Sequence, residues 1–420
     1  MRPIGVDLFS GAGGLSLGFE QAGFDIAAAV EIDPIHCATH EHNFPYSTTI
    51  CASVVGLTGY EIRSRANLGN TDIDVVFGGA PCQGFSMIGK RALDDPRNQL
   101  VFHYVRIVRE LQPKYCVFEN VKGLTLGKPA EILKELISEL DTAGYDIVLP
   151  YQVLNAADYG VPQDRRRLFL IGTRRGLTVP CYPQHSKQRT NVWEAIGDLP
   201  DADSFEELNT SDTVYADWKT EATYARRLRC IDDDPNNYGY ARKFDHETLT
   251  SSLRTKHTEL SKSRFIQTVH GKTEAVSHFR KLDPVGLCNT LRAGTDSARG
   301  AFTSPRPIHP FSPRVITVRE AARLHSYPDW FRFHSTKWHG FRQIGNSVPP
   351  LLARAVGAEI IQALNIAPAK PKKVIHPGSA DLLSFDMGSA ANHFRVPRNT
   401  IAQRTRKVHS EHYQMEFSYV

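Results

Sequence analysis

The chain has 420 residues, 41% of them hydrophobic and 23% charged, with a formal net charge of +5 at pH 7. This composition is that of a globular protein large enough for two domains, and the slightly basic balance weakly favours polyanionic partners. No apolar run of about 18 residues occurs, and the N-terminus lacks a signal-peptide pattern, so we expect a cytoplasmic protein without a transmembrane helix. The seven cysteines form no Cys-x-x-Cys pair, so we expect no disulfide framework and no metal.

Short apolar runs alternate with helix-like stretches through the first 175 residues, which is typical of a doubly wound α/β sheet. The predicted strands are Ile4–Phe9, Ile26–Ile32, Val75–Phe77, Tyr115–Phe118, Ile147–Val153 and Leu168–Ile171. Between the predicted strands Tyr115–Phe118 and Ile147–Val153, residues 130–143 carry apolar side chains at helical spacing. We therefore expect a Rossmann-like α/β fold.

The pattern changes near residue 180. Residues 181–285 are rich in Asp, Asn, Thr, Tyr and Arg and show no regular alternation of strands and helices. A helix is predicted from Val318 to Ser326, stopped by Pro328, and a longer one begins at the proline pair of "SVPP". We expect a first domain over residues 1–180, an irregular second domain over 181–312, a return to the first domain over 313–366, and a linker with a weakly ordered basic tail over 367–420.

The first predicted strand leads into a glycine-rich turn, "DLFSGAGG", which opens a helix. Gly11 and Gly13 permit the tight turn and let a ligand approach the backbone. Glu31 ends the second strand, where a carboxylate suits the hydroxyls of a ribose. The dinucleotide pattern would place a glycine at Ser16, so the turn leaves room for S-adenosylmethionine, which has no phosphate. A purely structural turn is the alternative.

A thiol and a carboxylate follow two further strands. Cys82 lies in "GGAPCQGFS", directly after the strand at Val75–Phe77, and Glu119 lies in "FENV", at the end of the next strand. Because the carboxyl ends of parallel strands bind ligands in such sheets, the pair is a candidate nucleophile and acid that needs no metal. Cys82 alone would more simply be a buried core cysteine.

Six motifs in order make the chain similar to the DNA (cytosine-5)-methyltransferase family of bacterial type, from restriction-modification systems or solitary. They are "DLFSGAGG", "GGAPCQGFS", "ENV", "QDRRR" at 163–167, "RVITVREAARLHSYP" and "QIGNSVPP". The resemblance covers nearly all of the chain outside residues 181–285. It implies an S-adenosylmethionine-dependent methyltransferase sheet with a smaller, irregular target-recognition domain over 181–312.

The resemblance also implies a reaction. The methyl group of S-adenosylmethionine would pass to C5 of a cytosine flipped out of double-stranded DNA at a specific short sequence. Cys82 would add to C6 as a thiolate and Glu119 would assist at N3. Arg167 would contact the cytosine O2 and Arg165 would make anion contacts near Cys82. A solvated basic run is the alternative for Arg165 and, more strongly, for Arg166. Asn120 would order the loop that carries Cys82.

The family resemblance assigns eight residues to the cofactor: Phe9, Gly11, Gly13, Glu31, Ile32, Ser53, Asn346 and Ser347. One of them departs from the family pattern. Ser53, in "TICASVVGL", stands where the family often has an acidic residue that accepts a hydrogen bond from the adenine amine. A hydroxyl can accept such a bond, but without charge.

The loop after Cys82 resembles the family's mobile lid, and Gln83, Ser86, Lys90 and Arg91 would contact DNA; an ordinary surface loop is the alternative. Expected partners are double-stranded DNA and a separately encoded restriction endonuclease, with the enzyme itself a monomer. Two other functions remain open. One is the family's RNA-directed branch, acting on a tRNA, and the other is an inactive paralogue that serves as a DNA-binding scaffold.

Overall fold

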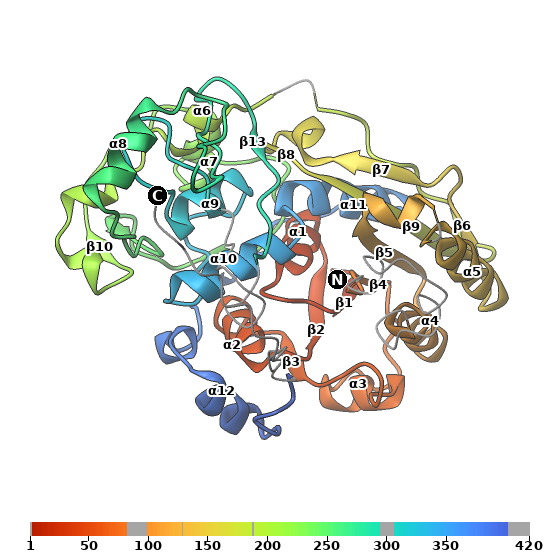
Figure 1. The fold of residues 1–420 in the computed structure, drawn as a ribbon. Coiled ribbons are helices and arrows are strands. Elements are labelled where there is room, and N and C mark those ends of the chain that lie inside the picture. The colour runs from red at the N-terminus through yellow and green to blue at the C-terminus, as the bar shows by residue number, and fades with distance from the viewer. Residues whose placement is uncertain (1, 82–98, 128, 187–188, 295–305, 402–420) are drawn as a thin grey trace, which may run out of the picture.

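Two lobes make up the molecule (Figure 1). The structure is a computed structural model that describes residues 2–81, 99–127, 129–186, 189–294 and 306–401. One lobe is built on a large twisted sheet, and the other consists of short helices and loops. Segments distant in sequence meet where the two lobes join.

The sheet has eight strands in the order β3-β2-β1-β4-β5-β9-β6, with β7 also paired to β9. The strands are β1 (Ile4–Leu8), β2 (Asp25–Glu31), β3 (Thr48–Cys51), β4 (Val75–Gly78), β5 (Tyr115–Val121), β6 (Tyr145–Ile147), β7 (Gln152–Asn155) and β9 (Arg166–Arg174). The first five are parallel, whereas β9 is antiparallel to β5, β6 and β7. The predicted doubly wound α/β fold is confirmed, with an antiparallel edge that apolar runs alone did not indicate.

One predicted strand is wrong. The run Ile147–Val153 is two strands, β6 and β7, because Pro150 interrupts it. Proline has no N–H to donate and cannot continue a central ladder. Both pieces instead pair with β9 at different places along its length.

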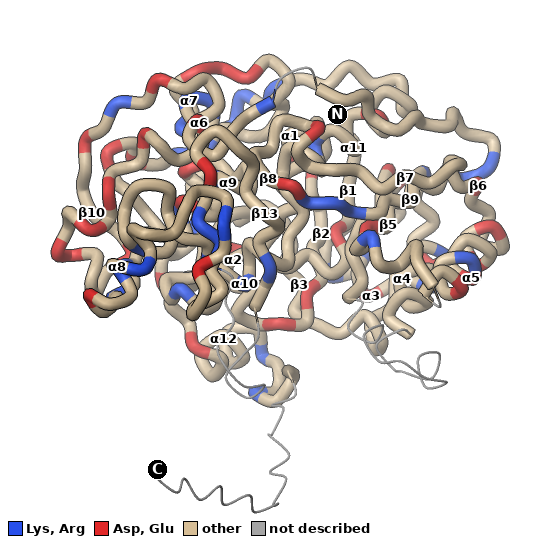
Figure 2. The backbone as a smooth tube through the Cα atoms, turned by 45° about the horizontal axis from the view of Figure 1, so that its top comes forward, with Lys and Arg blue, Asp and Glu red and all other residues tan. Residues whose placement is uncertain are grey.

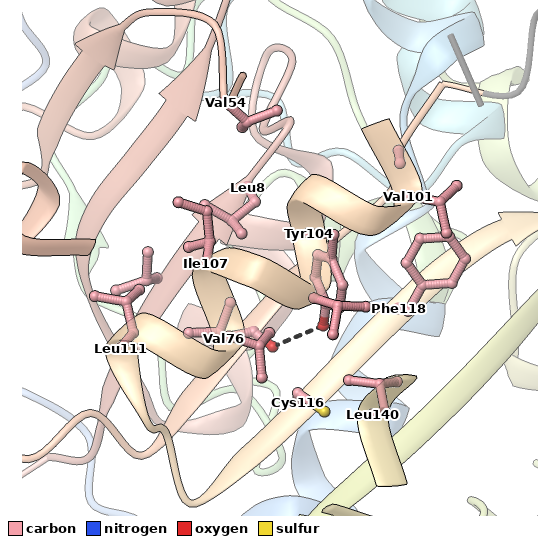
Figure 3. Packing of buried hydrophobic residues seen from close by; sticks show 14 of the residues in the cluster. Leu8, Val54, Val76, Val101, Tyr104, Ile107, Leu111, Cys116, Phe118 and Leu140 are labelled. Atoms are coloured by element: carbon pink, nitrogen blue, oxygen red, sulfur yellow. Dashed lines mark hydrogen bonds between the residues drawn. The ribbon is translucent and has the colours of Figure 1, made fainter. Parts of the chain in front are cut away.

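Helices cover both faces of the sheet. They are α1 (Gly14–Ala22), α2 (Pro34–Asn43), α3 (Gly59–Arg65), α4 (Gln99–Leu111), α5 (Pro129–Thr142) and α11 (Pro350–Ala363). Side chains alternate along each strand, so Val76 packs against α3, α4 and α5 while Val75 and Phe77 pack against α1 and α11. Figure 3 shows the first of these cores, where the Tyr104 hydroxyl donates to the Val76 carbonyl over 3.3 Å. The helix predicted over 130–143 is confirmed as α5.

The second lobe holds together with little regular structure. Its elements are α6 (Val192–Ile196), β10 (Val214–Tyr215), α7 (Thr223–Leu228), β11 (Ala241–Arg242), β12 (Thr248–Leu249), α8 (Glu259–Gln267), β13 (Cys288–Asn289), α9 (Val318–Leu324) and α10 (Lys337–Asn346). Strand β8 (Gln163–Asp164) lies at the junction of the lobes and pairs with β13. Helices α6, α7, α9 and α10 share one apolar core. The buried Arg323 bonds to the carboxylates of Asp198 and Asp329, which fixes loops that have no ladder of their own.

The predicted helix at Val318 begins where expected. Thr317 caps it by accepting from the Glu320 N–H, and the Glu320 carboxylate accepts from the Thr317 N–H. It ends at Leu324 rather than at Ser326, because Ser326 adopts a left-handed conformation with φ of 65°. The next long helix, α11, starts at the predicted proline pair.

Up to residue 401, where the described residues end, the C-terminal segment differs from the weakly ordered tail that the sequence predicted. Strand β14 (Val374–Ile375) pairs with β11, and α12 (Met387–Phe394) packs on α2. The Gly378 N–H donates to the His42 carbonyl over 2.8 Å. The partners of this segment are remote in sequence, so its local composition of Pro and Lys could not show that it docks.

None of the helices that the structure describes is both long and apolar enough to span a bilayer.

Candidate active site

The glycine-rich turn between β1 and α1 is left-handed at three positions. Phe9, Gly11 and Gly13 have φ of 62°, 55° and 104°. A side chain at Gly13 would collide with the Phe44 ring, 2.5 Å from the Cβ position, whereas a Cβ at Gly11 would have no neighbour within 4 Å. The turn is therefore closed on the side of α2 and open at Gly11, where a ligand can meet the backbone.

Glu31, at the end of β2, is fixed over this turn. One carboxylate oxygen accepts from the Gly11 N–H and the other from the N–H groups of Ile32 and Asp33, each over 2.9 Å. A carboxylate has about four acceptor sites, so at least one remains for a ribose hydroxyl. Ile32 is a partly exposed apolar side chain directly beside it. This arrangement fits an adenosine group.

The turn after α10 closes the other side of the same region. A Cβ at Gly14 would lie 2.8 Å from the Ser347 Cβ and 2.5 Å from the Val348 carbonyl oxygen. The Ser347 hydroxyl donates to the Ile344 carbonyl, and Asn346 is exposed. The structure therefore brings Ser347 next to Gly14, at the end of the glycine turn, with Asn346 directly before it in the chain.

Ser53 lies in the loop after β3, partly buried. Its hydroxyl accepts from the Val55 N–H over 3.3 Å. This local bond uses part of the acceptor capacity that an adenine amine would need.

Glu119 lies within β5, which runs three residues further than predicted, and its side chain is almost completely buried. The Arg167 Nε lies 3.0 Å from the Glu119 Oε1. Burial raises the pKa of Glu119 above its usual range, although Arg167 and Arg165 act in the opposite direction. A carboxyl group with a raised pKa, held by one arginine, is suited to hold or deliver a proton.

The strand that leads to Cys82 lies against this carboxylate. A Cβ at Gly79 would be 2.4 Å from the Glu119 Oε2, so only glycine allows the observed approach. The Asn120 amide donates to the Ala80 carbonyl over 3.0 Å. Glu119 and Asn120 therefore both lie against the two residues, Gly79 and Ala80, that follow β4.

Cys82 itself, together with Gln83, Ser86, Lys90 and Arg91, lies outside the described residues. Their predicted roles stay predictions.

Arg165 and Arg167 both lie near Glu119, but they have different partners. Arg165 is fully buried and its two Nη atoms donate to the carbonyls of Leu291, Gly345 and Ser347. Its Nε, which has no partner among the described residues, and the second N–H of its Nη1 remain for the anion contact expected near Cys82. Arg166 points to solvent. Figure 2 shows this basic stretch where β8 leads into β9.

Three buried polar residues near the site were missed from the sequence. Gln163 and His325 belong to motifs that the sequence analysis quoted, yet no spacing linked them to each other. Asp7, on β1, accepts from the Ser16 hydroxyl over 2.6 Å, and burial raises its pKa to about 8. In the described part of the chain, no group of three His, Cys, Asp or Glu residues is arranged to hold a metal ion.

Comparison with known proteins assigns the fold and family. The model of the C-5 cytosine-specific DNA methylase family matches residues 5–362. The Type II methyltransferase M.XorII of Xanthomonas oryzae is 64% identical over 407 residues, covering 97% of this chain and 96% of that protein. The Type II methyltransferase M1.HphI of Haemophilus parahaemolyticus is 33% identical over 364 residues, covering 85% and 86%.

Among solved structures, a putative DNA modification methyltransferase encoded within an E. coli prophage superposes with a TM-score of 0.73 at 35% identity, covering 87% of this chain and 100% of that one. The methyltransferase Dnmt2 of S. pombe, at 19% identity and a TM-score of 0.54, shares the fold and covers 87% and 100%. The protein therefore belongs to the C-5 cytosine-specific DNA methylase family and is a DNA (cytosine-5)-methyltransferase.

Proposed function

We propose that the protein transfers a methyl group from S-adenosylmethionine to C5 of a flipped-out cytosine within a specific short sequence of double-stranded DNA. The observation that carries this proposal is the buried Glu119–Arg167 pair, which lies against the strand leading to Cys82 and on the same sheet edge as the glycine turn. A proton-holding group, a nucleophile and an adenosine site then share one edge.

Each protein group has one task in this reaction. C5 of cytosine is a poor nucleophile until a nucleophile adds at C6, and the Cys82 thiolate forms that bond. Glu119, whose pKa is raised by burial, holds the proton at N3 as electron density moves into the ring. Arg167 keeps Glu119 in place and reaches the cytosine O2. Loss of the C5 proton and departure of the Cys82 sulfur then restore the aromatic ring.

Bound S-adenosylmethionine would supply an electrophilic methyl group to C5. The residues that would hold it are Phe9, Gly11, Gly13, Glu31, Ile32, Ser53, Asn346 and Ser347. The open space at Gly11 and the fixed Glu31 carboxylate support this assignment. Ser53 would make the weaker contact, because its hydroxyl already accepts a backbone bond.

DNA would bind across the junction between the lobes. Gln83, Ser86, Lys90 and Arg91 would contact it from the loop after Cys82, and the irregular lobe would read the sequence. The Type II names of the relatives support a cognate restriction endonuclease on a separate chain. We propose that the enzyme itself acts as a monomer.

The experiment that tests this function is sequencing DNA from a host that expresses the chain, after chemical conversion that distinguishes 5-methylcytosine from cytosine. Protected cytosines in one recurring short sequence are the expected result, and Cys82→Ser should abolish them while leaving S-adenosylmethionine binding largely intact. Normal protection in the Cys82→Ser host would refute the covalent mechanism. Protection confined to a tRNA, or cofactor binding with no methylation of either nucleic acid, would favour the RNA-directed or scaffold alternatives.

A further inference from the structure

A closed ring of buried hydrogen bonds lies where the two lobes meet. The Gln163 amide nitrogen is 3.0 Å from the His325 Nδ1, and the His325 Nε2 is 3.1 Å from the Ser347 carbonyl oxygen. Arg165 donates to that same carbonyl over 2.7 Å and to the Leu291 carbonyl over 2.8 Å. The Leu291 N–H returns to the Gln163 carbonyl oxygen over 3.1 Å, which closes the ring.

Every polar group of the Gln163 side chain is used. Its oxygen accepts from Leu291, and its amide nitrogen donates to the Leu324 carbonyl and to His325. The Ser347 carbonyl can only accept, so the His325 Nε2 carries the hydrogen and its Nδ1 accepts from Gln163. Burial and the nearby Arg165 keep the pKa of His325 well below its usual range, which holds this neutral form.

The ring joins three parts of the molecule that are remote in sequence. Strand β13, from the irregular lobe, pairs with β8, and the Thr290 hydroxyl donates to the Asp164 carbonyl over 2.6 Å. In Figure 1 these two strands lie at the junction of the lobes. The Ser347 side of the ring touches Gly14, at the start of α1.

The same short segment reaches the catalytic carboxylate. Two residues after Arg165, Arg167 forms its ion pair with Glu119. A displacement of Leu291 or Ser347 would therefore pass through the Arg165 guanidinium to the backbone that carries Arg167.

We propose that Arg165, held by Gln163 and His325, is a positioning residue. The positions of the irregular lobe and of the Ser347 turn fix Arg165, and Arg165 in turn fixes where Arg167 lies against Glu119. This inference rests on the roles proposed above for Glu119 and Arg167. It differs from an anion contact near Cys82, because it depends on the forked shape of the guanidinium rather than on its charge. The Arg165 side chain is fully buried and forms no ion pair within the described part of the chain, and both its Nη atoms donate to carbonyls.

Lysine at this position separates shape from charge. An ammonium group keeps the positive charge, but it lacks the planar fork that holds acceptors on opposite sides. The matched control is Arg166→Lys, at the exposed neighbouring position. Methyl transfer is measured with the full chain on genomic DNA from a host without cytosine methylation, and hydrogen–deuterium exchange is followed in peptides covering 286–293 and 343–349.

The expected result for Arg165→Lys is a kcat lowered by about 10- to 100-fold, as for a misplacement of about 1 Å, with faster exchange in both peptides. Arg166→Lys should match the wild type in both measurements. A kcat for Arg165→Lys within twofold of wild type would overturn the proposal. If hydrogen exchange were also unchanged, the positive charge alone would be sufficient; if exchange were faster, the ring would have a structural role only.

A second pair of variants decides the question if Arg165→Lys does not fold. Glutamine can place an amide near the His325 Nε2 position and asparagine near the Nδ1 position. His325→Gln therefore retains the bond to Ser347, and His325→Asn loses it. We expect kcat to fall further in His325→Asn than in His325→Gln; equal values would overturn the proposal. Glu119→Gln is assayed in parallel. Normal turnover in this variant would refute the proposed role of Glu119, whereas the hydrogen-exchange data test the hydrogen-bond ring independently of that role.

Discussion

Gly79→Ala should remove most of the activity and leave the fold intact. The added Cβ would lie 2.4 Å from the Glu119 Oε2 and 3.5 Å from the Glu119 carbonyl oxygen. An ordinary contact between carbon and oxygen needs more than about 3 Å, so the Glu119 carboxylate would have to move by up to about 1 Å. Because the colliding atom is the far end of a flexible side chain, that movement costs little stability. It shifts the oxygen atoms that face the substrate, however, and strains the 3.0 Å pairing with Arg167.

A misplacement of about 1 Å in an active site can reduce the rate by about 10²-fold, so we expect kcat to fall by about 10- to 100-fold. The assay is methyl transfer to unmethylated genomic DNA at saturating S-adenosylmethionine, with the melting temperature measured on the same preparation. The control is Gly56→Ala, where a Cβ would have no neighbour within 4 Å and φ is not positive. A Gly79→Ala enzyme with kcat within threefold of wild type would refute the placement of Glu119 against the strand leading to Cys82.

The remaining predictions concern chemistry, stability and pH. Glu119→Gln should lower methyl transfer by at least about 10²-fold, because Glu119 holds the N3 proton. The dissociation constant of S-adenosylmethionine, measured by calorimetric titration, should stay within a few-fold of wild type, because Glu119 does not touch the cofactor residues. A matching loss of cofactor affinity would contradict this. Arg242→Ala leaves the buried Glu20 without its charged partner, 2.7 Å away, and should cost about 3–5 kcal/mol in chemical denaturation. The exposed Arg175→Ala should cost no more than about 1 kcal/mol. Asp7→Asn should gain stability relative to wild type as the pH rises from 5 to 8: the pKa of Asp7 is raised to about 8 by burial, so the native state binds a proton that the unfolded state lacks in this range, and wild-type stability falls with rising pH. A difference between the two proteins that does not change with pH would contradict the buried, protonated Asp7.

The sequence alone determined the features that depend on neighbouring residues. Alternating apolar runs predicted the parallel strands, because each strand buries both faces under helices. The tight turn at Gly11 and Gly13 and the start of α9 at Val318 depend on residues within a few positions of each other, so local motifs predicted them. The resemblance predicted which carboxylate and arginine to examine, and the fold and family are confirmed.

Only the tertiary structure decided what remote segments do to one another. Pro150 divides a predicted strand whose halves both pair with β9, and the basic C-terminal segment docks on α2 through partners more than 300 residues away. Arg165 and Arg167 look equivalent in "QDRRR", yet one binds carbonyls from two distant segments and the other binds Glu119. A local pattern records which side chains share a face of a strand. It does not record which carbonyls the rest of the chain brings to that face, and those acceptors determine whether a buried arginine positions a site or takes part in its chemistry.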